Sequence, residues 1–468
     1  MILFQTIALL GWFPFAVLLF AVMSPPRAII AGYLIGTLFL PTTALEIFPF
    51  VPCCKLTVIP LGLVAGALMF ANGPLLSLKA RWIDLPIICY CLWPFCQLSN
   101  GVTPHDCCSI VVQGILIFGT PYALGRAYLA NVKGARDLAA AIFIGGLVYI
   151  PPCLIEMRIG PELHRIVYGM YADPDYLQAV RMNGFRPVVF MQHGLMVGLF
   201  MMAATMCGFW LWWRGALPKR FGFVPMWFIV LVQTAATILT RSTGAIVLLI
   251  VGIGGLLSLT MLRRGLLLYL LVAVPSGYVC ARILGNWDGV NLVQAVNDSM
   301  GAERAGSLLV RFRNERLLID KALIKPITGW GPNGANNIYN SSGKIIVIPD
   351  GFWVILLGSG GIVALVCFYG ALLLPMVALL QKLPRNCLAT PATAAPMVLA
   401  LIAVLFSIDC LANAMLNAIY ILGIGSVAGI VLSQRPQVPQ TRVVSNRVPQ
   451  SFRALPEPGN RAEPSATY

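Results

Sequence analysis

Long runs of hydrophobic residues alternate with short polar segments along almost the whole chain. A helix needs about 20 mostly apolar residues to cross the hydrocarbon core of a bilayer. The apolar runs therefore predict an all-α, polytopic integral membrane protein with about 12 to 13 transmembrane helices. The predicted spans are approximately 5–23, 28–45, 56–72, 85–99, 108–130, 138–156, 188–213, 221–239, 244–262, 265–284, 351–380, 391–411 and 414–433, of which the second and fourth match the pattern least well.

The longest charge-bearing stretch between apolar runs is formed by residues 307–360. Its spacing predicts a helix over 308–325, in which Arg311 and Glu315 lie one turn apart. Pro326 ends this helix, and a loop rich in glycine and asparagine leads to the next apolar helix. A polar loop is therefore predicted between two helices, and the chemistry of the protein is expected there.

Composition and charge place the chain in a membrane. Hydrophobic residues make up 59% of the sequence, charged residues only 10%, and the mean hydropathy is +0.84, which excludes a soluble globular protein. The net charge of +15 does not indicate nucleic acid, because the basic residues gather in alternate short loops. By the positive-inside rule these loops are cytoplasmic. They contain Arg27, Lys79, Arg81, Lys133, Arg136, Arg214, Lys219, Arg220, Arg263, Arg264, Lys382 and Arg385.

This topology places the N-terminus outside and the C-terminus inside, with two long loops, 157–187 and 285–350, on the outer face. The first apolar run lacks a basic leading segment and a cleavage site, so it is expected to stay as a helix. Residues 1–433 are predicted to form one transmembrane domain. The proline- and arginine-rich tail 434–468 is predicted to be disordered on the cytoplasmic side, where its charge favours contact with anionic lipid.

The chain contains 13 cysteines, and their spacing matches no metal site, so neither a metal nor another cofactor is predicted. Most of them are expected to be small apolar residues inside helices. The pairs Cys53-Cys54 and Cys107-Cys108 fall near loops of the predicted outer face. For these pairs, a disulfide between the loops and free, buried thiols are both compatible with the sequence.

Basic residues at the predicted outer face are candidates for binding an anion. Arg241 lies between two apolar runs that are only a few residues apart, so it is held near the outer interface. There it can snorkel or bind an anionic lipid headgroup. Residues 156–193 contain Arg186 and His193 among aromatic residues. Because guanidinium groups match phosphate oxygens and flat rings cover sugars, this stretch is either a substrate surface or a solvated interface.

Gly329, Gly331 and Gly334 match the glycine spacing of a dinucleotide-binding loop. No predicted strand precedes them, Pro332 interrupts them and no crossover unit follows. A nucleotide site is therefore rejected at this position. The glycines are instead expected to let the outer loop turn sharply over the membrane surface.

The order of these parts resembles the O-antigen ligase and O-antigen polymerase superfamily of bacterial inner-membrane glycosyltransferases. The residues that carry the resemblance are Thr240-Arg241-Ser242-Thr243-Gly244-Ala245 at the start of one helix, and Arg311, Pro326-x-x-Gly329-x-Gly331, a polar loop, and a helix with Leu356 and Gly358-x-x-Gly361. Four residues after Arg311 the chain has Glu315, where the family often has Trp. The motifs fall within residues 240–361, and the other helices match only in number and hydropathy.

Enzymes of this superfamily move a glycan from undecaprenyl diphosphate to an acceptor hydroxyl outside the cytoplasmic membrane, without a nucleotide or a required metal. The resemblance implies that Arg241 and Arg311 bind the diphosphate. Glu315, Gly329 and Gly331 are also expected to belong to the substrate site. Positive charge at the diphosphate would stabilise the leaving group as its negative charge develops.

The chain departs from the superfamily at the expected base. Members commonly have His-Asn or His-Ser just before the helix that follows the polar loop, whereas this sequence has Asp350-Gly351. A carboxylate can accept the proton of the acceptor hydroxyl, although it is a weaker base than imidazole. An Asp before a helix is also a common N-cap, and both roles fit the sequence. His164 and His193 are the reserve bases.

The predicted function is transfer of a saccharide from a lipid-linked donor to a glycan, lipid or protein acceptor, at the outer, periplasmic face of the cytoplasmic membrane. Ligase and polymerase differ in the acceptor, so the sequence does not separate them. A transporter or flippase for lipid-linked glycan is the alternative of another class, although the sequence shows no repeat of the transporter kind. Membrane lipids are the other expected partners, and no nucleic acid is expected.

Overall fold

A computed structural model describes residues 2–46, 50–173, 179–181, 184–261, 265–285, 287–332 and 334–433. Most of the described chain is helical, with two short antiparallel hairpins, so the predicted all-α class is confirmed. The chain divides into two units, Met1–Pro436 and Gln437–Tyr468, and the described residues belong to the first. The predicted disordered tail 434–468 lies outside the described residues.

The helices and strands have the following bounds. The helices are α1 Ile2–Val22, α2 Pro25–Phe39, α3 Lys55–Leu76, α4 Leu85–Leu92, α5 Pro104–Gly114, α6 Thr120–Tyr128, α7 Val132–Ile159, α8 Leu163–Tyr168, α9 Gly194–Trp213, α10 Met226–Leu239, α11 Thr243–Met261, α12 Leu266–Ile283, α13 Val290–Met300, α14 Ala302–Ala322, α15 Phe352–Lys382, α16 Ala394–Asp409 and α17 Ala418–Leu432. The strands are β1 Val180–Arg181, β2 Gly184–Phe185, β3 Arg220–Phe221 and β4 Val224–Pro225. A π-helical turn, Ile115–Gly119, joins α5 to α6.

Among the described residues, 8 helical segments are long and apolar enough to cross a membrane. They are Leu3–Val22, Lys55–Leu76, Pro104–Tyr128, Val132–Ile159, Gly194–Trp213, Thr243–Met261, Leu266–Ile283 and Phe352–Lys382. These helices fit a multi-pass membrane protein. The larger predicted number, about 12 to 13 spans, is not confirmed.

The remaining predicted spans fold into shorter helices. The helices α10, α16 and α17 have 14, 16 and 15 residues, so each extends for only about 21 to 24 Å. That is less than the hydrocarbon core of a bilayer, which is about 30 Å thick. Predicted span 28–45 becomes α2, which ends at Phe39, and 85–99 becomes α4 and a 3-10 segment. Burial in protein explains the apolar sequence of α16 and α17, whereas α10 leaves many of its large apolar side chains exposed.

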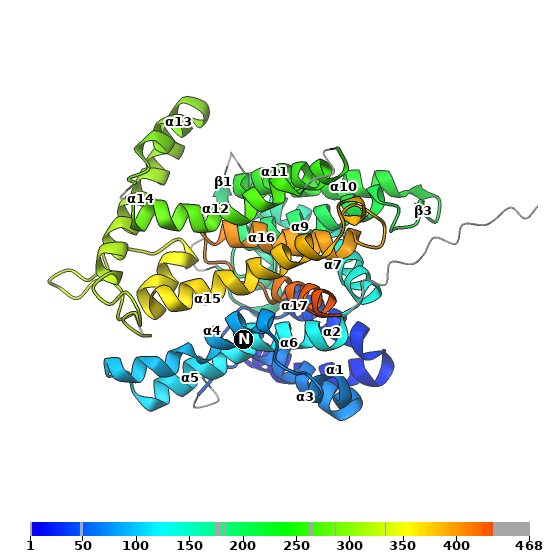
Figure 1. The fold of residues 1–468 in the computed structure, drawn as a ribbon, viewed down its shortest axis with the longest axis horizontal. Coiled ribbons are helices and arrows are strands. Elements are labelled where there is room, and N and C mark those ends of the chain that lie inside the picture. Colours follow the sequence, from blue (N-terminus) through cyan, green and yellow to red (C-terminus); the bar gives the residue numbers. More distant parts are fainter. Residues whose placement is uncertain are drawn as a thin grey trace, which may run out of the picture. The chain divides into compact units, whose positions relative to one another are not determined.

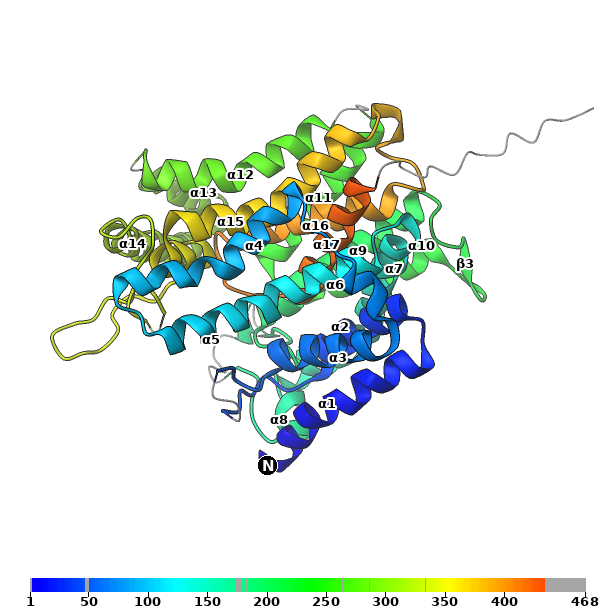
Figure 2. The ribbon, with the colours of Figure 1, turned by 60° about the horizontal axis from the view of Figure 1, so that its bottom comes forward.

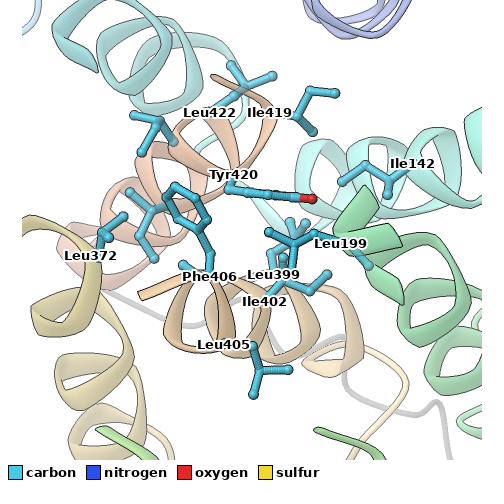
Figure 3. Packing of buried hydrophobic residues seen from close by; sticks show 14 of the residues in the cluster. Ile142, Leu199, Leu372, Leu399, Ile402, Leu405, Phe406, Ile419, Tyr420 and Leu422 are labelled. Carbon is cyan, nitrogen blue, oxygen red and sulfur yellow. The ribbon is translucent and has the colours of Figure 1, made fainter. Parts of the chain in front are cut away.

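Helix α16 lies at the centre of the hydrophobic core. It is apolar on every side, and its residues are buried as far as Ser407. It packs against α7, α9, α15 and α17. Figure 3 shows this packing around Phe406 and Tyr420, whose ring centroids are 5.2 Å apart. A helix that is apolar all round is typical of a fully buried position.

The helices form a bundle with two distinct ends (Figures 1 and 2). Helix α14 lies at one end, next to the start of α15, and this end is named the α14 end. Hairpin β3–β4 lies at the opposite end. The predicted helix 308–325 corresponds to α14, which begins earlier and ends at Ala322. The predicted loop 285–350 thus contains α13 and α14, and the predicted loop 157–187 contains α8 and hairpin β1–β2.

All 13 cysteines lie among the described residues, and their thiols are free. Cys53 and Cys107 are buried, whereas Cys54 and Cys108 are partly buried. Of the two alternatives for these pairs, the structure contains free thiols and no disulfide between the loops.

Candidate functional site

The turn between α10 and α11 holds Arg241 in an unusual backbone conformation. Residues 240–242 alone join the two helices, and Arg241 has a φ of +56°. This left-handed region is uncommon for a residue other than glycine, and it costs energy. Thr240 and Ser242 on either side are buried, and the Thr240 hydroxyl donates to the Thr237 carbonyl at 2.7 Å. The packed neighbours therefore fix the point from which the Arg241 side chain extends.

The Arg241 guanidinium lies against hairpin β1–β2. Its Nη1 donates to the Arg181 carbonyl at 3.1 Å, and it fills the space where a side chain on Gly184 would lie. Arg186 in turn donates from Nη2 to the Arg241 carbonyl at 3.3 Å. Among the described residues, no carboxylate forms an ion pair with Arg241. Within the described part of the chain, the Arg181 carbonyl is the one hydrogen-bond partner of this guanidinium, so the described residues leave several of its N–H donors for an anion.

His193 is the N-cap residue of α9 and is mostly buried. Its Nδ1 accepts a hydrogen bond from the Leu195 amide at 3.0 Å. Its Nε2 is 3.5 Å from a carboxylate oxygen of Asp173. The ring is therefore held in place from both sides, by the start of its own helix and by the loop that precedes it.

The pKa of His193 reflects the charges around the ring. Burial lowers this pKa most, and the Asp173 carboxylate acts in the opposite direction. The guanidinium groups of Arg186, Arg181 and Arg311 each lower it further. Arg311 belongs to α14, so the charge of a residue from the second predicted outer loop also acts on this ring. Together, Arg181, Arg186, Arg241 and Arg311 form the arginine cluster.

Arg311 on α14 forms an ion pair with Asp350, which lies just before α15. Nε of Arg311 is 3.6 Å from Oδ2 of Asp350, and the two side chains are 36% and 38% exposed. Nη1 of Arg311 also donates to the Ala412 carbonyl at 3.4 Å. Asp409, at the end of α16, lies near the same guanidinium. The predicted diphosphate ligand and the predicted base are therefore in direct contact.

Asp350 does not cap α15. The N-cap residue is Gly351, and no side chain caps the helix. The Phe352 amide donates instead to the Asn413 carbonyl at 3.1 Å, and the next amide donates to another carbonyl of the same segment. The predicted N-cap role is therefore wrong. Backbone carbonyls of the segment after α16 accept the first amides of α15 instead. The role of Asp350 as a base stays a prediction.

Glu315 is buried and connects three helices. Its carboxylate is 3.3 Å from Nε of Arg282 and accepts the Tyr278 hydroxyl at 2.8 Å, both from α12. Nε1 of Trp353, in α15, donates to its other oxygen at 3.4 Å. Burial raises the pKa of Glu315, and these donors oppose the shift. The contacts give Glu315 a structural role in placing α14, while its binding to substrate stays a prediction.

Gly329 and Gly331 let the loop after α14 pack closely against α15. Their φ values are +69° and +89°, in the region that favours glycine. A Cβ atom on Gly329 would lie 2.5 Å from the Ser359 carbonyl group, and the Gly331 amide donates to that carbonyl at 3.0 Å. The expected sharp turn is confirmed, and it serves this packing. Substrate binding by the two glycines stays a prediction.

His164, one of the reserve bases, is buried within the first predicted loop. Its Nδ1 is 2.6 Å from the Met170 carbonyl, and its Nε2 accepts the Thr42 amide at 3.2 Å. Burial lowers the pKa of His164. Because both ring nitrogens have backbone partners, the ring acts as a structural link. His193 is the reserve base that lies at the arginine cluster.

Two buried ionisable residues, Glu156 and Lys55, hold the loop before α9 in position. Neither was predicted as a site residue from the sequence. Glu156, in α7, is fully buried and accepts the amides of Val188 and Val189 at 2.8 and 2.7 Å. Lys55, at the start of α3, donates to the Phe190 carbonyl at 2.9 Å. Glu156 lies at the end of the predicted span 138–156, where a polar residue is common, so no local signal in the sequence distinguishes it.

Comparison with known proteins gives no family assignment. No family model matches the chain, and no curated protein matches it. The resemblance to the O-antigen ligase and polymerase superfamily therefore rests on the motifs and stays a prediction. The fold defines a class of protein: the chain is all-α, and its long apolar helices fit a multi-pass membrane protein.

Proposed function

We propose that this protein is a membrane glycosyltransferase of the O-antigen ligase type. It transfers a saccharide from undecaprenyl diphosphate to an acceptor hydroxyl at the outer face of the cytoplasmic membrane. The observation that carries the proposal is the arginine cluster. Hydrogen bonds join the turn before α11 to the loop before α9, and the charge of Arg311 on α14 acts on His193 at the end of that loop. Such a concentration of guanidinium groups suits a diphosphate.

In this proposal Arg241 and Arg311 bind the diphosphate of the donor. A guanidinium group donates two parallel N–H groups to phosphate oxygens, which fixes the donor in orientation as well as position. The diphosphate gains negative charge as it leaves the sugar, so these contacts become stronger toward the transition state. The strained turn at Arg241 and the ion pair at Arg311 hold both groups in place before the donor arrives.

Asp350 acts as the base. The acceptor oxygen forms a bond to the anomeric carbon of the donor sugar, and the bond from that carbon to the diphosphate oxygen breaks. The hydroxyl proton moves to the Asp350 carboxylate, and undecaprenyl diphosphate leaves with the bonding electrons. His193 is less suited to this step. Its Nδ1 accepts the Leu195 amide, so the neutral ring carries its proton on Nε2.

Two alternatives differ from this proposal in ways that can be measured. A polymerase of the same superfamily would use a second lipid-linked glycan as acceptor, with the same donor site. A transporter or flippase would use the arginines to line a pathway, and no bond would break. The contact between Arg311 and Asp350 favours an enzyme, because it puts a proton acceptor beside the phosphate ligand.

The test is incubation of the purified protein in liposomes with a lipid-linked saccharide and, separately, lipid A core, a protein acceptor or a second lipid-linked glycan. Release of undecaprenyl diphosphate together with a glycosylated acceptor is expected. The acceptor that is used separates ligase from polymerase. Arg316→Ala, which removes an exposed arginine from α14, is the matched control and should keep full transfer. Movement of the donor across the bilayer without bond breaking would favour the transporter instead.

A further inference from the structure

The end of the bundle opposite the arginine cluster contains a basic pocket of about 400 Å³. Helix α17 links the two ends. It begins at Ala418, after the segment that contacts Arg311, and ends at Leu432, which lines the pocket. The polar residues that line the pocket are Ser77, Lys79, Arg81, Arg126 and Ser433. By its basic residues, this is the predicted cytoplasmic end.

A bend in α3 shapes this pocket. Ala71 departs from helical geometry, with a φ of −156° and a ψ of 47°, shortly before Pro74, which has no N–H to donate to the preceding turn. The Tyr128 hydroxyl donates to the Ala71 carbonyl at 2.6 Å. The chain after the bend brings Lys79 next to α6, where Nη2 of Arg126 donates to the Lys79 carbonyl at 2.9 Å.

The carboxylate of Asp84 lies beside this pocket, and both of its oxygens already accept hydrogen bonds. Nη1 of Arg126 is 2.6 Å from Oδ2, the Arg81 amide donates to the same oxygen at 2.7 Å, and the Tyr122 hydroxyl donates to Oδ1 at 2.8 Å. The Asp84 and Arg126 side chains are 3% and 11% exposed, so they form a fixed wall. Among the described residues, no carboxylate pairs with Lys79 or with the Arg81 guanidinium. Three cations against one carboxylate leave an excess of positive charge.

An apolar groove of about 400 Å³ continues from the pocket between α4 and α6. Leu78 and Arg126 line both cavities, so the two are joined. Ile88, Leu92 and Ile115 line the groove and are 36%, 46% and 40% exposed. On a membrane-spanning protein, such exposed apolar side chains are suited to contact with lipid chains. A basic pocket that opens into an apolar groove matches a molecule with an anionic head and an apolar chain.

We propose that this pocket and groove bind an anionic membrane phospholipid. Its phosphodiester headgroup contacts Lys79 and Arg81, and one acyl chain lies in the groove between α4 and α6. The tail 434–468 is the other candidate, since it follows Ser433. It carries five arginines against two glutamates, so a basic pocket repels it. The inference is independent of the proposed transfer, because it involves no residue of the arginine cluster.

Native mass spectrometry of the full-length protein, released from liposomes of phosphatidylglycerol and phosphatidylcholine with the same acyl chains, tests this proposal. The protein should retain phosphatidylglycerol in preference to phosphatidylcholine. The variant Lys79→Gln/Arg81→Gln should lose about tenfold or more of this retention, because nearby basic residues each add to the attraction for anionic lipid. The matched control Lys219→Gln/Arg220→Gln removes the same charge from exposed residues at hairpin β3–β4 and should retain the lipid.

The groove and the identity of the occupant need their own variants. Ile88→Trp fills the groove, and it should weaken retention of long-chain but not short-chain phosphatidylglycerol. Excess inorganic phosphate should not displace the lipid. Equal retention by the Lys79/Arg81 variant and its control would overturn the proposal, as would equal retention of phosphatidylcholine or displacement by phosphate. A photocrosslinking residue in place of Leu78, which lines both cavities, should capture lipid, and capture of tail peptides instead would assign the pocket to the tail.

Discussion

Two arginines near the α14 end, Arg282 and Arg241, have opposite surroundings. Arg282 is 1% exposed, forms an ion pair with Glu315, and donates to the carbonyls of Trp287 and Phe312 at 2.6 and 2.9 Å. Arg241 donates to one backbone carbonyl and has no carboxylate partner among the described residues. The same side chain is thus neutralised at one site and leaves its charge available at the other.

This difference separates a structural arginine from a ligand-binding one. A buried arginine that is paired with a carboxylate holds helices together, and its charge is not available to a substrate. An arginine that is held by carbonyl groups keeps N–H donors and positive charge for an anion. The comparison therefore supports binding of the donor diphosphate at Arg241 and not at Arg282.

The largest expected effect comes from removing the carboxylate that pairs with Arg282. In Glu315→Ala, the guanidinium of Arg282 stays buried without its partner, which costs about 3 to 5 kcal/mol. Thermal unfolding of the purified protein should show this loss, and transfer should fall with it. Arg316→Ala, which removes an exposed ion pair with Asp320 on the same helix, should change stability by less than about 0.5 kcal/mol. Equal stability of the two variants would contradict the structural role of Glu315.

Replacing the proposed base should affect transfer alone. Asp350→Asn should reduce transfer by about 10²- to 10⁴-fold, because the amide cannot take up the acceptor proton. Its stability should stay within about 1 kcal/mol of the parent, because Asp350 does not cap α15 and its ion pair with Arg311 is partly exposed. Single-turnover transfer and thermal unfolding measure the two effects. A fully active Asp350→Asn variant, together with an inactive but folded His193→Ala variant, would move the base to His193.

A smaller effect is expected from moving Arg241 without changing it. In Gly184→Ala, the new Cβ would lie 1.6 Å from Nη1 of Arg241, so the flexible guanidinium must move away. Transfer should fall by about tenfold because the donor is then held less well, while stability changes by less than about 1 kcal/mol. Gly244→Ala is the matched control, because its Cβ meets nothing within 4 Å. If both variants transfer at the parent rate, the position of the Arg241 guanidinium does not matter.

The smallest expected effect is a pH dependence of stability. Burial lowers the pKa of both His164 and His193, so folding favours the neutral rings. Their contribution to stability should be complete above the ordinary histidine pKa of about 6.5 and decrease as the pH falls below it. The parent should therefore lose more stability between pH 7.5 and pH 5 than His164→Gln or His193→Gln, as measured by thermal unfolding. Parallel pH profiles would show that the rings do not contribute.

Hydrophobic pattern was sufficient to predict the helical class and the long apolar helices, because both depend on runs of local sequence. It was not sufficient to separate spans such as α7 from the buried core helix α16, since both are apolar. The N-cap expected at Asp350 failed for a related reason. The carbonyl groups that take its place come from the segment after α16, which is distant in sequence.

The sequence predicted individual residues of the candidate site, but it did not predict which of them lie together in the fold. Arg241 and Arg311 stood out because they are charged residues beside apolar runs. Their connection through the loop that carries Arg186 and His193 depends on tertiary contacts that no local pattern encodes. Glu156, which holds that loop, resembles any polar residue near the end of a helix until its burial and partners are known.

Donor binding and transfer, measured side by side on purified variants of Arg241 and Arg311, test the central claim most directly. Arg241→Ala should lose nearly all transfer while staying folded, and Arg241→Lys should lose much of it because the ammonium group lacks the paired donors. Arg311→Ala should bind the donor within about tenfold of the parent while its transfer falls by about a hundredfold or more. Full transfer by Arg241→Ala, or equal losses of binding and transfer in Arg311→Ala, would contradict the claim that these arginines stabilise a leaving diphosphate.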